Sequence, residues 1–135
     1  VRMLEDFLDE AGLPAQSYAL HDGSGMSVYN RVTPRGMVDL LSFAADQSWF
    51  DAWLSDQPIS GVDGSLRRRF VGTPLEGKVF AKTGTLNGVN ALSGVMIAAS
   101  GRRLLFSIIA NDRPATTRSA VAEMDAALNW VAERY

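Results

Sequence analysis

The fold is decided by one continuous stretch, residues 78–110, whose sequence is KVFAKTGTLNGVNALSGVMIAASGRRLLFSIIA. Strand-forming side chains dominate three runs within it, at residues 78–83, 89–99 and 104–110. Ser100-Gly101, between the second and third runs, is a tight-turn signal typical of a hairpin. The stretch therefore predicts three consecutive antiparallel strands that form a meander.

Helical patterns flank this predicted meander on both sides. After it, apolar residues recur every three or four positions and predict an amphipathic helix that covers one sheet face: Val121, Met124, Leu128 and Val131. Before it, Thr33-Pro34 predicts a helix start, because Thr can cap free amides and Pro at the first helical position loses no hydrogen bond. A short helical piece is expected at residues 49–54, and a helix that begins upstream of Val1 is expected to end near Gly12.

The order of these elements predicts the α+β class: an antiparallel three-stranded meander with flanking helices. Residues 61–77 are rich in glycine, proline and arginine and predict an extended loop. Only one helix is predicted after the meander, so we expect the opposite sheet face to lack a full cover from this chain.

Composition sets the limits of these predictions. The 135 residues, 47% of them apolar, suffice for one hydrophobic core and one domain. The net charge of −2 gives no general attraction to a polyanion, so nucleic acid is not an expected partner. The basic run Arg67-Arg68-Arg69 is expected in a solvated loop without a functional role.

The residue composition also disfavours a metal site and a membrane-spanning helix. The chain has no cysteine and a single histidine, His21, so it contains neither a thiolate site nor the paired histidines of common zinc sites. We expect no metal and no cofactor. No apolar run approaches the roughly 20 residues that a membrane-spanning helix needs.

The chemistry is expected at Lys82-Thr83-Gly84-Thr85, near the end of the first predicted strand. Because side chains alternate along a strand, Thr83 and Thr85 point to one face, where two hydroxyls can bind a carboxylate. Gly84 lets neighbouring groups approach closely. Lys82, on the other face, is expected to run beneath the strand and favour the deprotonated form of a catalytic hydroxyl.

Two other polar clusters are expected to be structural. His21, Asp22 and Ser24 or Ser27 contain the residue types of a hydrolase triad, but residues so close in sequence rarely aim their side chains at one another. We expect an Asp-based turn there. Residues 63–65, Asp-Gly-Ser, are expected to form a turn at the margin of the cleft, with substrate contact as the alternative.

Lys-Thr-Gly is also the third element of the set S-x-x-K, S-D-N and K-T-G of β-lactamases and penicillin-binding proteins. The chain resembles one branch of that group, the class C low-molecular-mass penicillin-binding proteins, in which a lysine-threonine-glycine strand precedes two hairpin strands and a terminal helix. The resemblance is carried, in order and spacing, by four blocks: residues 22–27 with Asn30, residues 61–66, residues 77–86, and Val89 with residues 92–94.

The resemblance implies that residues 1–135 are the C-terminal portion of a D-alanyl-D-alanine peptidase domain with the penicillin-recognising fold. It also implies catalytic roles for Lys82 and Thr85, with the Thr85 backbone N–H in the oxyanion hole, and substrate-binding roles for Thr83, Gly84 and Thr85. The implied ligands are peptidoglycan peptides ending in D-Ala-D-Ala and β-lactams, in a periplasmic or other extracytoplasmic compartment. Carboxypeptidase and endopeptidase action both stay open.

The first two motifs of the set are missing from this sequence. No serine is followed three positions later by lysine, and none is followed two positions later by asparagine. We therefore expect the nucleophile to come from an upstream part of the same protein. A non-catalytic binding or assembly module derived from the same fold is the alternative.

Overall fold

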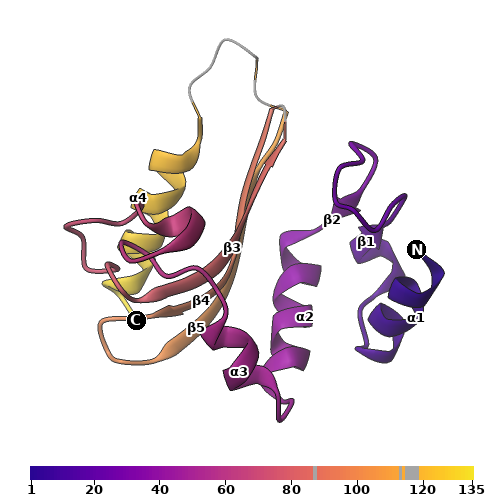
Figure 1. Ribbon diagram of the computed structural model, residues 1–135, viewed down its shortest axis with the longest axis horizontal. Coiled ribbons are helices and arrows are strands. Elements are labelled where there is room, and N and C mark those ends of the chain that lie inside the picture. Colours follow the sequence, from indigo (N-terminus) through magenta and orange to yellow (C-terminus); the bar gives the residue numbers. More distant parts are fainter. Residues whose placement is uncertain (87, 113, 115–118) are drawn as a thin grey trace. The chain divides into compact units, whose positions relative to one another are not determined.

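The computed structural model describes residues 1–86, 88–112, 114 and 119–135 (Figure 1). The chain divides into two compact units, Val1–Phe50 and Asp51–Tyr135. The motif Lys82-Thr83-Gly84-Thr85 belongs to the second unit, which also contains the three-stranded sheet.

The first unit contains two helices and a two-stranded sheet. Its elements are α1 (Arg2–Glu10), the 3-10 turn η1 (Ala15–Ser17), β1 (Tyr18–Ala19), β2 (Arg31–Val32) and α2 (Pro34–Ala45). β1 and β2 pair antiparallel, with Tyr18 opposite Val32. The sequence did not predict this sheet, because two-residue strands are too short to show alternation.

The predicted start of α2 is confirmed. The Thr33 hydroxyl accepts a hydrogen bond of 3.0 Å from the Gly36 backbone N–H, and Pro34 occupies the first helical position. In the same unit, α1 ends before Gly12, whose φ of +76° suits glycine. The Phe7 and Phe43 rings meet edge to face and join α1 to α2.

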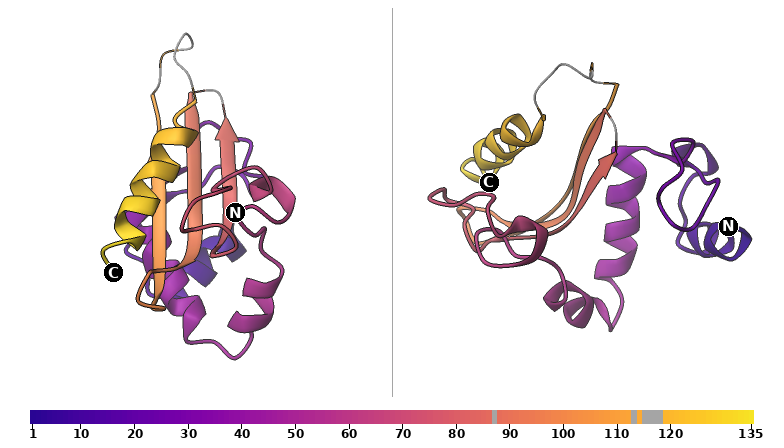
Figure 2. Two further views of the ribbon diagram at one scale, coloured as in Figure 1. Left: turned by 90° about the vertical axis from the view of Figure 1, so that its left-hand side faces the viewer. Right: turned by 45° about the horizontal axis from the view of Figure 1, so that its top comes forward.

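The second unit confirms the predicted meander and terminal helix. α3 (Phe50–Ser55) crosses the boundary between the units and is followed by η2 (Gly64–Leu66), β3 (Val79–Leu86), β4 (Val89–Ile97), β5 (Arg103–Ala110) and α4 (Val121–Ala132). The strand order is β3-β4-β5, and both pairings are antiparallel. Figure 2 shows α4 lying along one face of this sheet.

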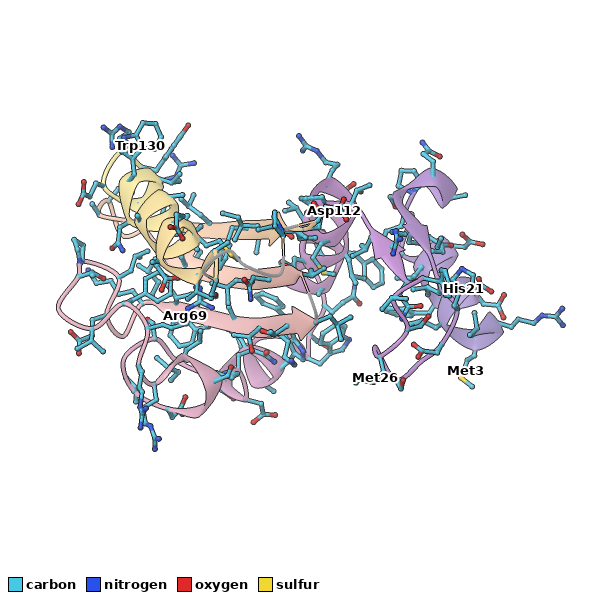
Figure 3. The ribbon with its side chains drawn as sticks, turned by 90° about the horizontal axis from the view of Figure 1, so that it is seen from above. Met3, His21, Met26, Arg69, Asp112 and Trp130 are labelled. Atoms are coloured by element: carbon cyan, nitrogen blue, oxygen red, sulfur yellow. The ribbon has the colours of Figure 1, made fainter. Side chains whose placement is uncertain are left out.

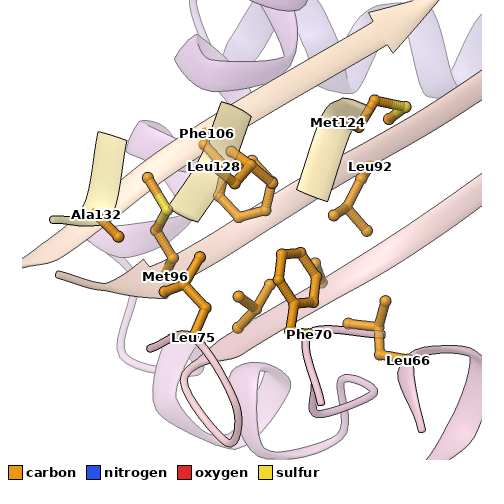
Figure 4. Close-up of a cluster of buried hydrophobic side chains, with 11 residues drawn as sticks. Leu66, Phe70, Leu75, Leu92, Met96, Phe106, Met124, Leu128 and Ala132 are labelled. Atoms are coloured by element: carbon orange, nitrogen blue, oxygen red, sulfur yellow. The ribbon is translucent and has the colours of Figure 1, made fainter. Parts of the chain in front are cut away.

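The main core lies between the sheet and α4 (Figure 4). The strand register places alternate residues on this face, and they meet the apolar stripe of α4. The core residues are Leu66, Phe70, Leu75, Val79, Ala81, Leu92, Met96, Phe106, Met124, Leu128 and Ala132. The prediction that the terminal helix covers one sheet face is therefore confirmed.

The segment at residues 61–77 differs from the expected extended loop. It contains η2 and supplies three buried side chains to the core, Leu66, Phe70 and Leu75. Ser60 anchors its ends, because its hydroxyl donates to the Leu75 carbonyl at 2.6 Å and accepts from the Val79 N–H at 3.0 Å. A segment without regular periodicity is thus part of the packed structure.

The sheet face opposite α4 carries its own set of apolar side chains. Val95 is buried, whereas Phe80, Ile97 and Leu105 on the same face are half-buried. A cavity of about 290 Å³ lies at this face and is lined in part by Leu54 of α3.

Candidate active site

β3 is an edge strand of the sheet that the structure describes, so the backbone N–H and C=O groups on its outer side are not paired with another strand of that sheet. Next to that edge, the Val79 N–H donates to the Ser60 hydroxyl and the Ala81 N–H donates to the Pro58 carbonyl at 3.2 Å. Backbone groups alternate in direction along an antiparallel strand, so Thr83 and Thr85 also direct their N–H and C=O groups away from β4. The outer edge of β3 therefore carries the Thr85 N–H, the group expected in the oxyanion hole.

Lys82 reaches the same edge. Its parity differs from that of Thr83 and Thr85, as the sequence predicted, but its ammonium group bends around the strand and donates to the Thr83 carbonyl at 2.6 Å. The side chain is exposed. The strand thus brings the Lys82 ammonium and the Thr85 N–H to one side, although their side chains leave opposite faces.

The other motif residues line a cavity of about 250 Å³. Its wall includes Thr83, Gly84 and Thr85 of β3, together with Asn90 and Ala91 of β4. A Cβ atom added at Gly84 would lie 3.3 Å from the Cβ of Ala91, so glycine at this position permits close contact between the two strands. Lys82 is not among the lining residues.

Ser65 is a further residue of this wall. Its hydroxyl oxygen lies 3.0 Å from the Thr83 hydroxyl oxygen, although the two residues are 18 positions apart in sequence. The expected turn at residues 63–65 is present as η2, and Asp63 accepts the Ile59 N–H at 2.7 Å. The structure therefore brings a hydroxyl from the 61–77 segment to the motif threonine.

Asn90 fixes the start of α4 next to the cavity. It is buried, with 4% of its surface exposed, and its side-chain oxygen accepts from the Ala120 N–H at 3.1 Å and from the Ser119 hydroxyl at 3.2 Å. The sequence did not indicate this role, because a single Asn within a strand has no distinguishing pattern.

The basic run Arg67-Arg68-Arg69 was expected to be solvated, and for Arg69 this expectation is wrong. Arg69, labelled in Figure 3, lines the cavity wall. Its guanidinium is paired with Asp125 of α4 through Nε and Nη2, and Nε lies 3.2 Å from each carboxylate oxygen. Only 12% of the Arg69 side chain and 17% of the Asp125 side chain are exposed. Arg69 is therefore a packed ion-pair partner rather than a solvated loop residue.

Asp22 is the centre of a turn, as expected. Its carboxylate accepts from the Asn30 side chain at 2.7 Å, the Ser24 hydroxyl at 2.8 Å, and the Ser27 and Gly25 backbone N–H groups. These bonds, the one from Asn30 above all, lower the pKa of Asp22. His21 contacts the Tyr29 ring at 5.6 Å between centroids, and its backbone N–H donates to Asn30.

The described residues offer neither a candidate metal cluster nor a candidate membrane helix. Among them, no group of three or more His, Asp or Glu side chains is placed to hold a metal ion. No helix in the same part of the chain is long and apolar enough to cross a membrane.

The fold and the motif define a chain of the penicillin-recognising class. The profile of the D-Ala-D-Ala carboxypeptidase 3 (S13) family matches residues 1–133, so the chain belongs to that family. This agrees with the resemblance to the low-molecular-mass penicillin-binding proteins.

Curated relatives support the same assignment. The chain is 39% identical over 125 residues to the D-alanyl-D-alanine carboxypeptidase of Actinomadura sp. (strain R39), a match that covers 89% of this chain and 23% of that protein. It is 35% identical over 105 residues to the D-alanyl-D-alanine carboxypeptidase DacB of Haemophilus influenzae, covering 76% of this chain and 22% of that protein. The chain thus spans about a quarter of the length of these relatives.

Solved structures give the same fold. Penicillin-binding protein 4 of H. influenzae superposes with a TM-score of 0.81 at 30% identity, covering 98% of this chain and 30% of that one. A predatory endopeptidase of Bdellovibrio bacteriovorus, in complex with an immunity protein, gives a TM-score of 0.78 at 21% identity, covering 97% of this chain and 36% of that one. The second match supports the fold alone.

Proposed function

We propose that this chain forms one wall of the active site of a serine-type D-alanyl-D-alanine carboxypeptidase or endopeptidase. Its substrate is a peptidoglycan peptide ending in D-Ala-D-Ala. The observation that carries the proposal is the edge of β3, where the Lys82 ammonium lies beside the backbone of Thr83 and the Thr85 N–H points outward. Membership of the D-Ala-D-Ala carboxypeptidase 3 family supports the proposal.

Each motif residue has a distinct role in the proposed reaction. The Thr83 and Thr85 hydroxyls bind the terminal carboxylate of the substrate, and the Thr85 N–H donates to the oxyanion that forms at the attacked carbonyl. Gly84 keeps β3 close to β4 at this point. The positive charge of Lys82 favours the deprotonated form of the nucleophile and attracts the anionic substrate.

The proposed chemistry proceeds through an acyl-enzyme and uses neither metal nor cofactor. The serine hydroxyl gives its proton to a base and its oxygen bonds to the carbonyl carbon of the penultimate D-Ala. The C–N bond to the terminal D-Ala then breaks, and the leaving amine takes up that proton. Water then cleaves the ester. A β-lactam follows the first step only, because its ring C–N bond opens and the acyl group stays attached.

The nucleophile itself comes from outside these 135 residues in this proposal. The sequence contains no serine three positions before a lysine and no S-x-N, so an upstream part of the same protein supplies both motifs. Since peptidoglycan lies outside the cytoplasmic membrane, the proposed site of action is periplasmic or otherwise extracytoplasmic.

A second candidate function follows from the same missing motifs. A binding or assembly module that retains the β3 edge as a ligand surface needs no nucleophile and performs no hydrolysis. The sequence immediately upstream distinguishes the two, because S-x-x-K together with S-x-N favours the enzyme.

Labelling with a fluorescent penicillin tests the proposal. The full-length protein is expected to be labelled covalently at an upstream serine, whereas residues 1–135 alone are expected to stay unlabelled. Mass spectrometry of the adduct locates the acylated residue. Covalent labelling of residues 1–135 alone, or no labelling of the full-length protein, would contradict the proposal that the nucleophile lies upstream.

A further inference from the structure

Two hydroxyl groups, those of Ser65 and Thr83, lie side by side at the wall of the 250 Å³ cavity, and only Thr83 belongs to the motif. Ser65 and Thr83 are both accessible there, Ser65 being exposed and Thr83 half-buried, and in the structure the Thr83 hydroxyl donates to the Ser65 hydroxyl at 3.0 Å. We propose that Ser65 is a positioning residue for carboxylate recognition, acting through the Thr83 hydroxyl. The inference rests on the proposed function, in which Thr83 binds the substrate carboxylate.

The direction of the hydrogen bond between the two hydroxyls decides whether Thr83 can donate to a ligand. A hydroxyl has one donor hydrogen and two acceptor sites, and its hydrogen rotates to suit its partners. When Thr83 donates to Ser65, the Thr83 hydrogen is unavailable to an anion. When Ser65 donates to Thr83, that hydrogen is free, and the Thr83 oxygen is polarised by the hydrogen bond that it accepts.

A bound carboxylate selects the second arrangement, because a carboxylate only accepts hydrogen bonds. The hydrogen bonds then run in one direction, from Ser65 to Thr83 and from Thr83 to the anion. A ligand whose carboxyl group is blocked as an ester forms a weaker, uncharged contact and gains less from this relay. Ser65 is therefore expected to increase discrimination in favour of a free carboxylate.

The backbone beneath Ser65 is well fixed, whereas its side chain has no packing role. The next residue, Leu66, is fully buried, and its carbonyl accepts hydrogen bonds from the Gly61 N–H at 3.0 Å and the Arg69 N–H at 2.9 Å. Because this backbone is held in place, the short Ser65 side chain loses little conformational entropy when its hydroxyl is positioned. Its removal is not expected to disturb folding.

Among the described residues that line the cavity, Arg69 is the only charged one. Arg69 lines the cavity and uses Nε and Nη2 for Asp125, so Nη1 makes no hydrogen bond within the described part of the chain. The guanidinium is held in a fixed orientation by this pairing. The Asp125 carboxylate offsets its charge, so Arg69 offers this wall a hydrogen-bond donor at Nη1 and little net charge.

Ser65→Ala in the full-length protein tests the inference with two β-lactams, benzylpenicillin and its methyl ester. The second-order acylation rate constant for benzylpenicillin is expected to fall by about threefold to tenfold, as for loss of an indirect hydrogen bond to a charged group. The rate constant for the ester is expected to change by less than about twofold, and Ser65→Thr is expected to restore discrimination because it keeps the hydroxyl.

Ser93→Ala is the matched control. The Ser93 and Ser107 hydroxyls form a similar pair at 2.9 Å on the opposite face of the sheet, so their loss is not expected to change the ratio of the two rate constants. Equal losses for both β-lactams in Ser65→Ala, or no loss for either, would overturn the inference. If the wild-type protein is acylated by neither compound, the proposed function fails instead, which keeps the two failures distinct.

Discussion

At the scale of single residues, Lys82 and Thr83 are neighbours in sequence but make different contacts. Lys82 is exposed and donates to a backbone group, the Thr83 carbonyl. Thr83 is half-buried and contacts Ser65 through its side chain. Replacing either residue should therefore affect substrate chemistry more than folding.

Lys82→Ala in the full-length protein is expected to lower the acylation rate constant by about tenfold to a hundredfold. Loss of one charge-assisted contact is worth about 1.5–3 kcal/mol, which gives this range. Thr83→Val should act in the same direction but less strongly, since it keeps the shape. Stopped-flow labelling with a fluorescent penicillin measures the rate, and melting temperature should hardly change.

The matched control for Lys82 is Lys78→Ala. Lys78 is the only other lysine in the sequence and lies just before β3, outside the motif. It is expected to leave the acylation rate unchanged. Full activity in Lys82→Ala would end the assignment of a catalytic role to the motif lysine.

Asp22 gives a prediction about pH. Its lowered pKa means that the carboxylate stabilises the folded turn fully above the ordinary aspartate pKa of about 3.9, and that this contribution is lost as pH falls through the lower folded value. Asn30 is the largest cause, so Asn30→Ala is expected to raise the pKa of Asp22. NMR titration of the Asp22 carboxyl carbon measures it.

Ser24→Ala serves for comparison with Asn30→Ala, because the Ser24 hydroxyl is the second cause of the lowered pKa. It is expected to raise the pKa of Asp22 by a smaller amount. An Asp22 pKa that is the same in both variants and in the wild type would show that these two hydrogen bonds do not lower it.

At the scale of elements, β4 is the central strand of the sheet. Its residue Gly94 packs against the backbone of β3, which leaves no room for a side chain. Gly94 lies opposite Ala81 of β3 and Phe106 of β5. A Cβ atom at Gly94 would lie 2.2 Å from the Phe80 carbonyl oxygen and 2.7 Å from the Ala81 Cα. Backbone atoms in the middle of a sheet have little freedom to move away.

Gly94→Ala is therefore expected to reduce the free energy of unfolding by about 1–3 kcal/mol or more, the range for overpacked interiors. Urea denaturation measures the change. Gly23→Ala is the control, because nothing lies within 4 Å of a Cβ atom added there and its φ is not in the left-handed region. Equal stability of the two variants would show that β3 and β4 are less closely apposed than the structure indicates.

At the scale of the whole molecule, the second unit is held together by contacts between segments far apart in sequence. The Arg69–Asp125 pair joins the 61–77 segment to α4 across 56 positions. The Arg103–Asp51 pair, by contrast, has side chains that are 61% and 82% exposed. The first pair is more buried and has three hydrogen bonds, whereas the second has one, so the first is expected to contribute more to stability.

Asp125→Ala is expected to reduce the free energy of unfolding by about 2–3 kcal/mol, somewhat below the roughly 3–5 kcal/mol for breaking a fully buried pair. Asp51→Ala is expected to cost less than about 1 kcal/mol, because exposed pairs contribute little. Chemical denaturation of both variants provides the comparison. A similar small loss in both would mean that the Arg69–Asp125 pair does not anchor the 61–77 segment.

The sequence by itself determined the elements whose signals are local. Runs of strand-forming side chains and the Ser100-Gly101 turn located β3, β4 and β5. The Thr33-Pro34 pair located the start of α2, and apolar residues at every third or fourth position located α4. The alternation of side chains along a strand placed Thr83 and Thr85 on one face and Lys82 on the other. The family followed from the spacing of the motif blocks, which is also a property of the sequence alone.

Only the tertiary structure decided which distant residues join the motif. Ser65 and Arg69 come from a segment without periodicity, and nothing near them in sequence indicates that Ser65 meets Thr83 or that Arg69 meets Asp125. These contacts follow from the burial of Leu66, Phe70 and Leu75, which docks the segment against the sheet. Local patterns specify the face to which a side chain points, whereas its partner there depends on how the whole core packs.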